Sequence, residues 1–242
     1  MNASITTSWD DGHPLDLKTA ALLAKYGLKG TFYVPTRFSE WPLMTKAQIV
    51  ELDRMGMEIG SHTVNHAVLT ELSDSHVRGE LIESRNELED LLGKPVPAFC
   101  FPKGRFNART CRLAQQAGYK LARTTVGFRT GRDFNPARMP VSVQFVPHSR
   151  NIHVRHALKE GNAKGLLNWI RVCKLVTELR QLCVLMMNSA VVESGIFHIW
   201  GHSWELQNLG LWRQLEEVCE IASSMRLEPR TNSQLVSNSQ LV

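Results

Sequence analysis

The sequence lacks any long run of apolar residues. Its most apolar late stretch, residues 182–187, is far shorter than the roughly 20 residues that a membrane-spanning helix needs. The first residues show no basic segment followed by a long apolar run, so neither a secretory signal nor a transit peptide is visible. We therefore expect no membrane span and a cytoplasmic location.

Paired cysteines and blocks of one charge are also missing. The five cysteines are odd in number, show no C-x-x-C spacing and lie in apolar segments, which predicts reduced thiols packed in the interior. The net charge is +5, but the 28 basic residues look dispersed along the chain. This pattern favours a solvated surface and no nucleic-acid partner.

The composition is that of an ordinary globular domain, with 43% hydrophobic and 21% charged residues in 242. Short β-branched or aromatic runs alternate with segments of helical periodicity, which predicts an α/β fold built on a mostly parallel sheet. The predicted strands cover residues 4–9, 31–34, 58–61, 98–101, 120–124, 141–146 and 196–200. The predicted helices cover residues 15–26, 45–55, 74–92, 107–117, 166–176, 177–192 and 211–224.

The end of the chain is polar and repetitive. Asn-Ser-Gln-Leu-Val occurs at residues 232–236 and again at 238–242. We therefore expect one folded domain over residues 1–228 and a disordered polar tail over residues 229–242.

Two acidic residues follow the first predicted strand. Adjacent residues of a strand point to opposite faces, so Asp10 and Asp11 can do different jobs at the mouth of a barrel. Taken alone, Asp-Asp-Gly fits equally well a turn in which an aspartate caps the next helix and Gly12 supplies an unusual φ.

Two histidines four residues apart follow the third predicted strand. His62 and His66 can aim two imidazole nitrogens at one cation, and a carboxylate from another strand would complete three ligands with an open fourth position. Such a pair on a surface loop is usually coincidental, and no Glu follows His62 as the H-E-x-x-H motif of a zinc protease requires. Its position at a strand end favours ligation.

A third polar group follows the last predicted strand. His202 lies there, and Glu205 could orient its ring or contact a substrate. The alternative for His202 is a buried histidine satisfied by a backbone carbonyl, which is the better interpretation for His198.

These segments resemble the motifs of a known family, the polysaccharide deacetylases of the NodB-homology type, also called carbohydrate esterase family 4. Residues 8–12 resemble its first motif, His62 and His66 its H-[S/T]-x-x-H pair, residues 101–104 its third motif and residues 200–202 its fifth. The order agrees over roughly residues 4–225. The resemblance implies a distorted, incomplete (β/α) barrel of about seven βα units.

The resemblance also implies a role for each residue. Asp10 would be the general base and His202 the general acid, while Asp11, His62 and His66 would hold a divalent metal ion, with zinc as the first choice. The amide N–H of Lys103 would serve the oxyanion. Four aromatic side chains near the strand ends could surround a sugar: Trp9, Phe101, Trp200 and Trp204. The alternative is that they are ordinary core residues.

Two features depart from the family pattern. Cys100 stands where many members have an arginine that contacts the catalytic aspartate, and no clear fourth motif is present. Lys103 and Arg123, at the ends of neighbouring predicted strands, are candidates to replace that arginine, although each is also readily explained as a surface charge.

The resemblance implies a metal-dependent hydrolase that removes an N-acyl group, N-acetyl first, from an amino sugar or glycan precursor. Three alternatives stay open: a metallo-amidase on a non-sugar amide, a deformylase on a lipid-linked sugar, and an inactive carbohydrate-binding protein of the same fold. A two-carboxylate glycosidase is excluded because adjacent aspartates cannot flank a glycosidic bond. A dinucleotide-binding fold is excluded because G-x-G-x-x-G is missing after the first strand. The oligomeric state is left open.

Overall fold

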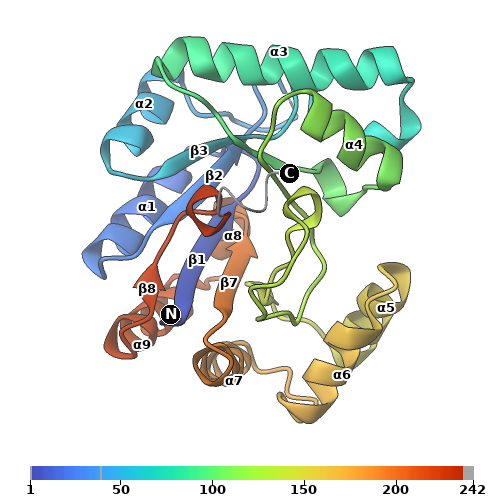
Figure 1. Cartoon of the computed structure of the whole chain (residues 1–242). Helices are drawn as coiled ribbons and strands as arrows, with labels where there is room; N and C mark the ends of the chain where they lie inside the picture. The colour runs from blue at the N-terminus through green and yellow to red at the C-terminus, as the bar shows by residue number, and fades with distance from the viewer. Residues whose placement is uncertain (1, 39, 237–242) are drawn as a thin grey trace.

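A curled parallel sheet organises the chain, as the computed structural model shows for residues 2–38 and 40–236 (Figure 1). Seven strands pair in parallel in the order β5-β4-β3-β2-β1-β7-β6, and a short eighth strand pairs with β1. Because β5 and β6 end the order without pairing to each other, the barrel is incomplete. The strands are β1 (Ser4–Trp9), β2 (Gly30–Val34), β3 (Glu58–Ser61), β4 (Ala98–Cys100), β5 (Leu121–Arg123), β6 (Val143–Gln144), β7 (Ile196–Gly201) and β8 (Glu228–Pro229).

Helices follow most strands and pack around the sheet (Figure 1). Local signals set several of their ends: Thr45 and Gln48 form a capping box at the start of α2, and Ser73 and the left-handed Gly93 bound α3. No helix within residues 2–38 and 40–236 is long and apolar enough to cross a membrane. The α-helices are α1 (Asp16–Lys25), α2 (Lys46–Arg54), α3 (Asp74–Leu92), α4 (Ala108–Gln116), α5 (Arg150–Lys159), α6 (Ala163–Arg171), α7 (Leu179–Val192), α8 (Ser203–Asn208) and α9 (Trp212–Ser224).

The core lies on both faces of the sheet. Strand alternation sends Phe32 and Val34 to the outer core beneath the helices, whereas Tyr33 between them joins Cys100 on the inner face of the barrel. Parallel strands buried on both sides explain why all six residues of β1 are inaccessible. The five cysteines are free and buried, which confirms their prediction as packing residues.

The predicted fold class is confirmed, but the region between β5 and β7 differs from expectation. Helix α5 was not predicted, since residues 150–159 carry no continuous apolar stripe. The helix expected over residues 166–176 begins earlier, at Ala163, and ends at Arg171. Strand β6 keeps only two of the six residues expected to form it.

The expectation of a disordered tail from residue 229 is wrong for residues 229–236. Asn232 is fully buried inside the barrel, where its side chain accepts a hydrogen bond from the Tyr33 hydroxyl at 2.8 Å and donates one to Thr6 at 2.8 Å. Its backbone N–H donates to Thr31 at 2.9 Å. The polar composition of this segment suggested disorder, but the polar groups of Asn232 form hydrogen bonds inside the barrel. Residues 237–242 lie outside the described residues.

Candidate active site

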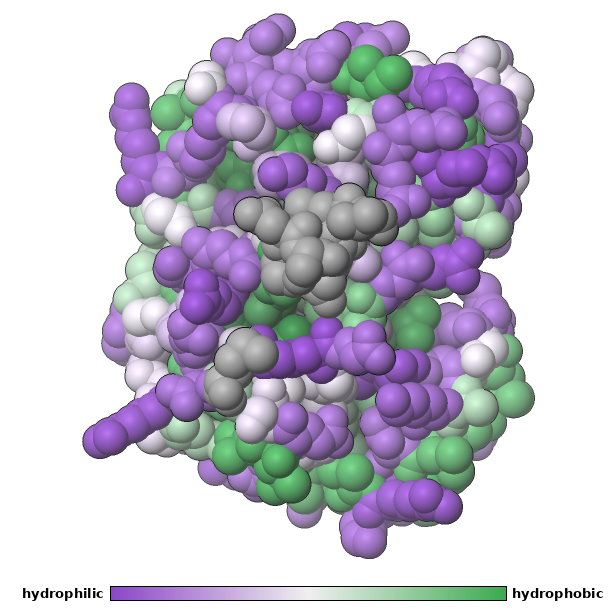
Figure 2. Space-filling view, in the orientation of Figure 1, coloured by the Kyte–Doolittle hydropathy of each residue, from purple (hydrophilic) through white to green (hydrophobic). Residues whose placement is uncertain are grey.

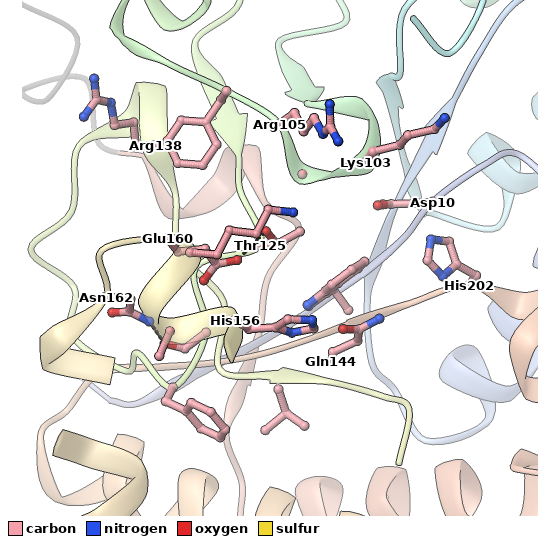
Figure 3. Close-up of a pocket in the computed structure, with 18 of the residues that line it drawn as sticks. Asp10, Lys103, Arg105, Thr125, Arg138, Gln144, His156, Glu160, Asn162 and His202 are labelled. Carbon is pink, nitrogen blue, oxygen red and sulfur yellow. Dashed lines mark hydrogen bonds between the residues drawn. The ribbon is translucent and has the colours of Figure 1, made fainter. Parts of the chain in front are cut away.

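The residues singled out from the sequence meet at the carboxyl ends of the strands, as a parallel α/β architecture predicts. Most of them line a cavity of about 850 Å³. Figure 3 shows Asp10 and His202 on the same wall of this cavity, with Lys103 and Arg105 close by. The site residues come from six different strand ends: Asp10 and Asp11 (β1), His62 and His66 (β3), Cys100 (β4), Arg123 (β5), Gln144 (β6) and His202 (β7).

The backbone after β1 turns the two aspartates apart. Asp11 has a left-handed φ of 79°, and Gly12 follows with φ 61°. A Cβ at Gly12 would lie 3.0 Å from Val34, so a glycine is required there by both conformation and space. As a result, the Asp10 carboxylate faces Arg123 and the Asp11 carboxylate faces the histidines.

Asp11, His62 and His66 form a compact group of donor atoms, all within 4.8 Å of one another. Asp11 Oδ1 lies 3.7 Å from His62 Nε2 and 3.4 Å from His66 Nε2. His62 Nδ1 lies 2.9 Å from the Cys100 carbonyl, which must accept the hydrogen bond and therefore leaves the Nε2 lone pair facing Asp11.

The electrostatics of this group fit a divalent cation. Burial lowers the pKa of His62 and of His66 to about 4, so both rings are neutral and able to ligate at physiological pH. Burial, with the nearby charge of Asp10, raises the pKa of Asp11 above its usual value. A bound cation would stabilise the ionised form of Asp11. Two neutral imidazoles with one carboxylate are a ligand set that zinc accepts.

Two indoles position Asp11. Trp204 Nε1 donates to Asp11 Oδ2 at 3.0 Å, and Trp41 Nε1 donates to the Asp11 carbonyl at 3.3 Å. Trp204 therefore contacts a candidate ligand, whereas it was expected to contact a sugar. Trp41 was not singled out from the sequence, because no motif surrounds it.

Position 100 carries a cysteine, and the guanidinium that contacts Asp10 comes from Arg123 instead. Its fully buried guanidinium donates to Asp10 Oδ1, while the Cys100 thiol lies 3.6 Å from Asp10 Oδ2. Burial has the largest single effect and acts to raise the pKa of Asp10, but the charges of Arg123, His62 and His202, with the Arg123 hydrogen bond, together outweigh it and lower that pKa. Of the two candidates for this contact, Arg123 makes it, and Lys103 lies exposed on the cavity wall.

His202 lies near one carboxylate oxygen of Asp11, and the other two histidines lie near the other oxygen. Its Nε2 is 3.7 Å from Asp11 Oδ2, and its Nδ1 is 2.5 Å from Glu205 Oε2. Burial acts to lower the pKa of His202, but the Glu205 hydrogen bond and the charges of Asp11 and Asp10 outweigh it and raise that pKa to about 9. His202 is therefore protonated at neutral pH.

Three of the four aromatic residues expected to surround a sugar do not line the cavity: Trp9, Phe101 and Trp204. Trp9 and Phe101 are buried, do not line the cavity and belong to the outer core, so their expected role is wrong. Strand alternation is the reason: the side chains of Asp10 and Cys100 face inward, so their neighbours face outward. Trp200 does line the cavity, 4.8 Å from the Arg123 guanidinium.

The cavity also extends toward α5 and α6, away from the aspartates. In Figure 3, His156 and Gln144 face its centre, and Asn162 lies at its far end. Sequence reasoning missed His156 because no helix was predicted over residues 150–159, and it missed Gln144 and Asn162 because neither belongs to a recognised motif. His198, by contrast, is a buried histidine bonded to Ser8 at 2.9 Å and to the Pro140 carbonyl at 3.3 Å, which confirms its interpretation as structural.

Comparisons with known proteins found relatives of one kind. A family model described as polysaccharide deacetylase matches residues 2–122, half of the chain. A putative polysaccharide deacetylase of Bacillus subtilis is 28% identical over 131 residues, which are 53% of this chain and 47% of that protein. A peptidoglycan-N-acetylglucosamine deacetylase of Bacillus cereus is 29% identical over 100 residues, or 41% of this chain and 45% of that protein. The matched regions thus span about half the length of these curated relatives.

Solved structures give the same architecture. A Streptococcus pyogenes deacetylase in complex with acetate is 26% identical, with a TM-score of 0.53 over 62% of this chain and 67% of that one. The Xyl-CE4 domain of a multidomain xylanase from the hindgut metagenome of Trinervitermes trinervoides has a TM-score of 0.60 over 97% of this chain and 90% of that one. At 18% identity, this second likeness concerns the fold alone.

Proposed function

The chain belongs to the polysaccharide deacetylase family, and from that premise we propose that it is a metal-dependent hydrolase that removes an N-acyl group, N-acetyl first, from an amino sugar or glycan precursor. The observation that carries this proposal is the group formed by Asp11, His62 and His66, with Asp10 and His202 lining the same cavity. A cytoplasmic location stays a prediction from the sequence.

In this proposal, Asp11, His62 and His66 hold the metal ion. A bound divalent ion, zinc first, would supply Lewis acidity to the amide carbonyl and lower the pKa of water. Asp10, kept ionised by Arg123, accepts the proton of the attacking water. His202, protonated at neutral pH, gives its proton to the departing amine.

The other cavity residues orient the substrate. Lys103 has a left-handed φ of 55° in the turn after β4, and we assign its backbone N–H to the developing oxyanion. Trp200 supplies an aromatic wall. A cavity of about 850 Å³ far exceeds the size of an acetyl group, which supports a substrate of at least one sugar residue.

The substrate class is tested by incubating the protein, loaded with zinc, with N-acetylated amino sugars, N-formylated amino sugars and small non-sugar amides. We expect acetate and free amine from the first group. Acid and amine released from non-sugar amides alone would indicate an amidase instead. No release from any of the compounds would favour the carbohydrate-binding alternative.

The base is tested by Asp10→Asn. The amide cannot accept the proton, so turnover should fall by roughly two orders of magnitude or more while the metal content stays unchanged. Turnover is measured as acetate release and metal content by plasma mass spectrometry. Asp90→Asn, at an exposed position of α3, is the matched control and should keep full activity. Full turnover in the Asp10 variant would remove Asp10 from the mechanism.

A further inference from the structure

Helices α5 and α6 form a hairpin that stands apart from the barrel (Figure 1). Their inner faces pack on each other and on the body: the rings of His153 and Trp169 lie 5.0 Å apart, and Phe128 contacts both at 5.1 and 5.9 Å. His156 and Asn162 of the hairpin also line the cavity. The outer face of the hairpin has no packing partner among the described residues.

The charge of the whole chain is concentrated at this hairpin and the segment after it. Residues 150–180 carry seven Lys or Arg and only two Asp or Glu, a net charge of +5, and the remaining residues carry 21 of each sign. The sequence-based expectation of dispersed positive charge is therefore wrong for this segment. The rest of the chain is formally neutral.

Exposed aliphatic side chains gather on the same two helices. Of the nine large hydrophobic side chains exposed among residues 2–38 and 40–236, five belong to the hairpin: Ile152, Val154, Leu158, Leu167 and Ile170. In Figure 2, hydrophobic and hydrophilic residues are interleaved over the part of the surface where Figure 1 places these helices.

On α6 the pattern has helical order. Ala163, Leu167 and Ile170 are spaced by four and three residues, so they share one exposed line along the helix, with Lys164 and Arg171 beside it. The buried residues of α6, Gly165 and Trp169, lie on the opposite side. An outward apolar stripe flanked by cations is the pattern of a helix that lies in a membrane interface.

We propose that the outer face of the α5–α6 hairpin docks the protein onto the surface of an anionic lipid bilayer. The aliphatic side chains would enter the boundary between headgroups and acyl chains, and the cations would reach the lipid phosphates. The exposed apolar residues are all aliphatic, which suits acyl chains, whereas a glycan surface is recognised by aromatic stacking.

Docking in this way would bring the cavity close to the bilayer, because the hairpin lines the cavity with its inner face. An amino sugar anchored in the same membrane would then meet the active site. That consequence rests on the proposed function. Docking itself does not, and it is tested without any substrate.

The test is flotation of the purified protein with vesicles. We expect binding to phosphatidylcholine vesicles containing 30% phosphatidylglycerol at 50 mM salt, weak binding to pure phosphatidylcholine, and release at 500 mM salt, because added ions screen the attraction. No binding to the anionic vesicles, or equal binding to both compositions, would overturn the proposal.

Two sets of variants assign the binding to the hairpin. Reversing three cations in R155E/K164E/R171E should lower partitioning to anionic vesicles at least about a hundred-fold, since each cation near such a surface contributes about fivefold. The matched control R54E/R112E/K120E changes exposed positions of α2, of α4 and immediately before β5. It should bind anionic vesicles at least about tenfold better than R155E/K164E/R171E. Equal loss in both would show a non-specific charge effect and would overturn the proposal.

The apolar contribution is tested by L167S/I170S, which should lower partitioning about tenfold. Its control, I82S/V191S, changes side chains of similar exposure, 41% and 44% against 45% and 42%, on α3 and α7, which are not part of the hairpin. Circular dichroism and melting temperature show that each variant is folded. A dimer in light scattering that dissociates in L167S/I170S, without any vesicle binding, would replace the proposal by self-association.

Discussion

The pair formed by Arg123 and Asp10 shows how one strand can supply a contact that its neighbour lacks. β4 and β5 are paired in register, with Cys100 opposite Arg123. A guanidinium from either position can therefore reach Asp10 from the inner face of the barrel. The neutral thiol at position 100 leaves room for the arginine to come from β5, where it also lies over the Trp200 ring.

Replacing Arg123 by Met should move the acidic limb of the pH profile of kcat/KM to higher pH. A base must be deprotonated to act, and without the Arg123 charge and hydrogen bond the effect of burial would be opposed less, so the pKa of Asp10 would rise. Activity would therefore appear only at higher pH than in the parent. Arg123→Lys, which retains the charge, should recover part of the shift. An unchanged acidic limb in the Met variant would show that Arg123 does not control this carboxylate.

His202 and Glu205 control the opposite limb. A general acid must hold its proton, so activity that depends on His202 is present below its pKa of about 9 and is lost as the pH rises through that value. Glu205→Gln keeps the size of the side chain and removes its charge, which should lower the pKa of His202 and move the alkaline limb down by about one unit. The measurement is again kcat/KM against pH, with zinc content as the control for an intact site.

At the scale of elements, the segment after β8 acts as an internal plug of the barrel. Asn232 connects to β1 and β2 by three hydrogen bonds, although it is distant from both in sequence. Leu235 and Val236 add apolar contacts to the inner-face cluster of Tyr33 and Cys100. The segment therefore closes the inner face of the sheet with both polar and apolar groups.

Asn232→Ala should lower the free energy of unfolding by about 1–3 kcal/mol, because the buried hydroxyls of Tyr33 and Thr6 lose their partner. Asn208→Ala, at an exposed position of α8, is the control and should cost less than about 0.5 kcal/mol. Urea unfolding followed by circular dichroism measures both. Equal effects would mean that the plug contributes little to stability.

At the scale of the whole molecule, binding of a metal ion at this site should stabilise the folded chain against unfolding. The donors of Asp11, His62 and His66 come from β1 and β3, so a shared cation would join two strand ends that unfolding separates. A metal that binds only the folded chain stabilises it by about 2.7 kcal/mol at a hundredfold excess over Kd. For a chain of this size, that corresponds to roughly 5–10 °C in melting temperature.

We expect a chelator to lower the melting temperature by this amount and zinc to restore it, as scanning calorimetry would show. His66→Ala should remove the zinc-dependent shift, and His76→Ala, at an exposed position of α3, should keep it. A wild-type melting temperature that responds to neither chelator nor zinc would contradict the assigned ligands.

Much of the architecture is determined by short-range patterns in the sequence. β-Branched runs, helical spacing and caps such as Ser73 and Gly93 act over a few residues. The positions of the main strands along the chain and the bounds of α3 were therefore predictable. The strand-end positions of Asp10, Asp11, His62, His66 and His202 followed from the same order. Strand alternation, applied strictly, would also have placed Trp9 and Phe101 in the core.

Only the tertiary structure decided which distant groups meet. Arg123 pairs with Asp10, and Asn232 enters the barrel, because the sheet brings together residues that are 113 and up to 226 positions apart. Its position at a strand end made Arg123 one of two candidates, but the sequence did not decide between Arg123 and Lys103, and nothing near Asn232 in the sequence marks its contacts. The outward face of α5 and α6 is likewise a result of packing: the contacts of His153 and Trp169 with Phe128 determine which sides of the two helices are left to solvent.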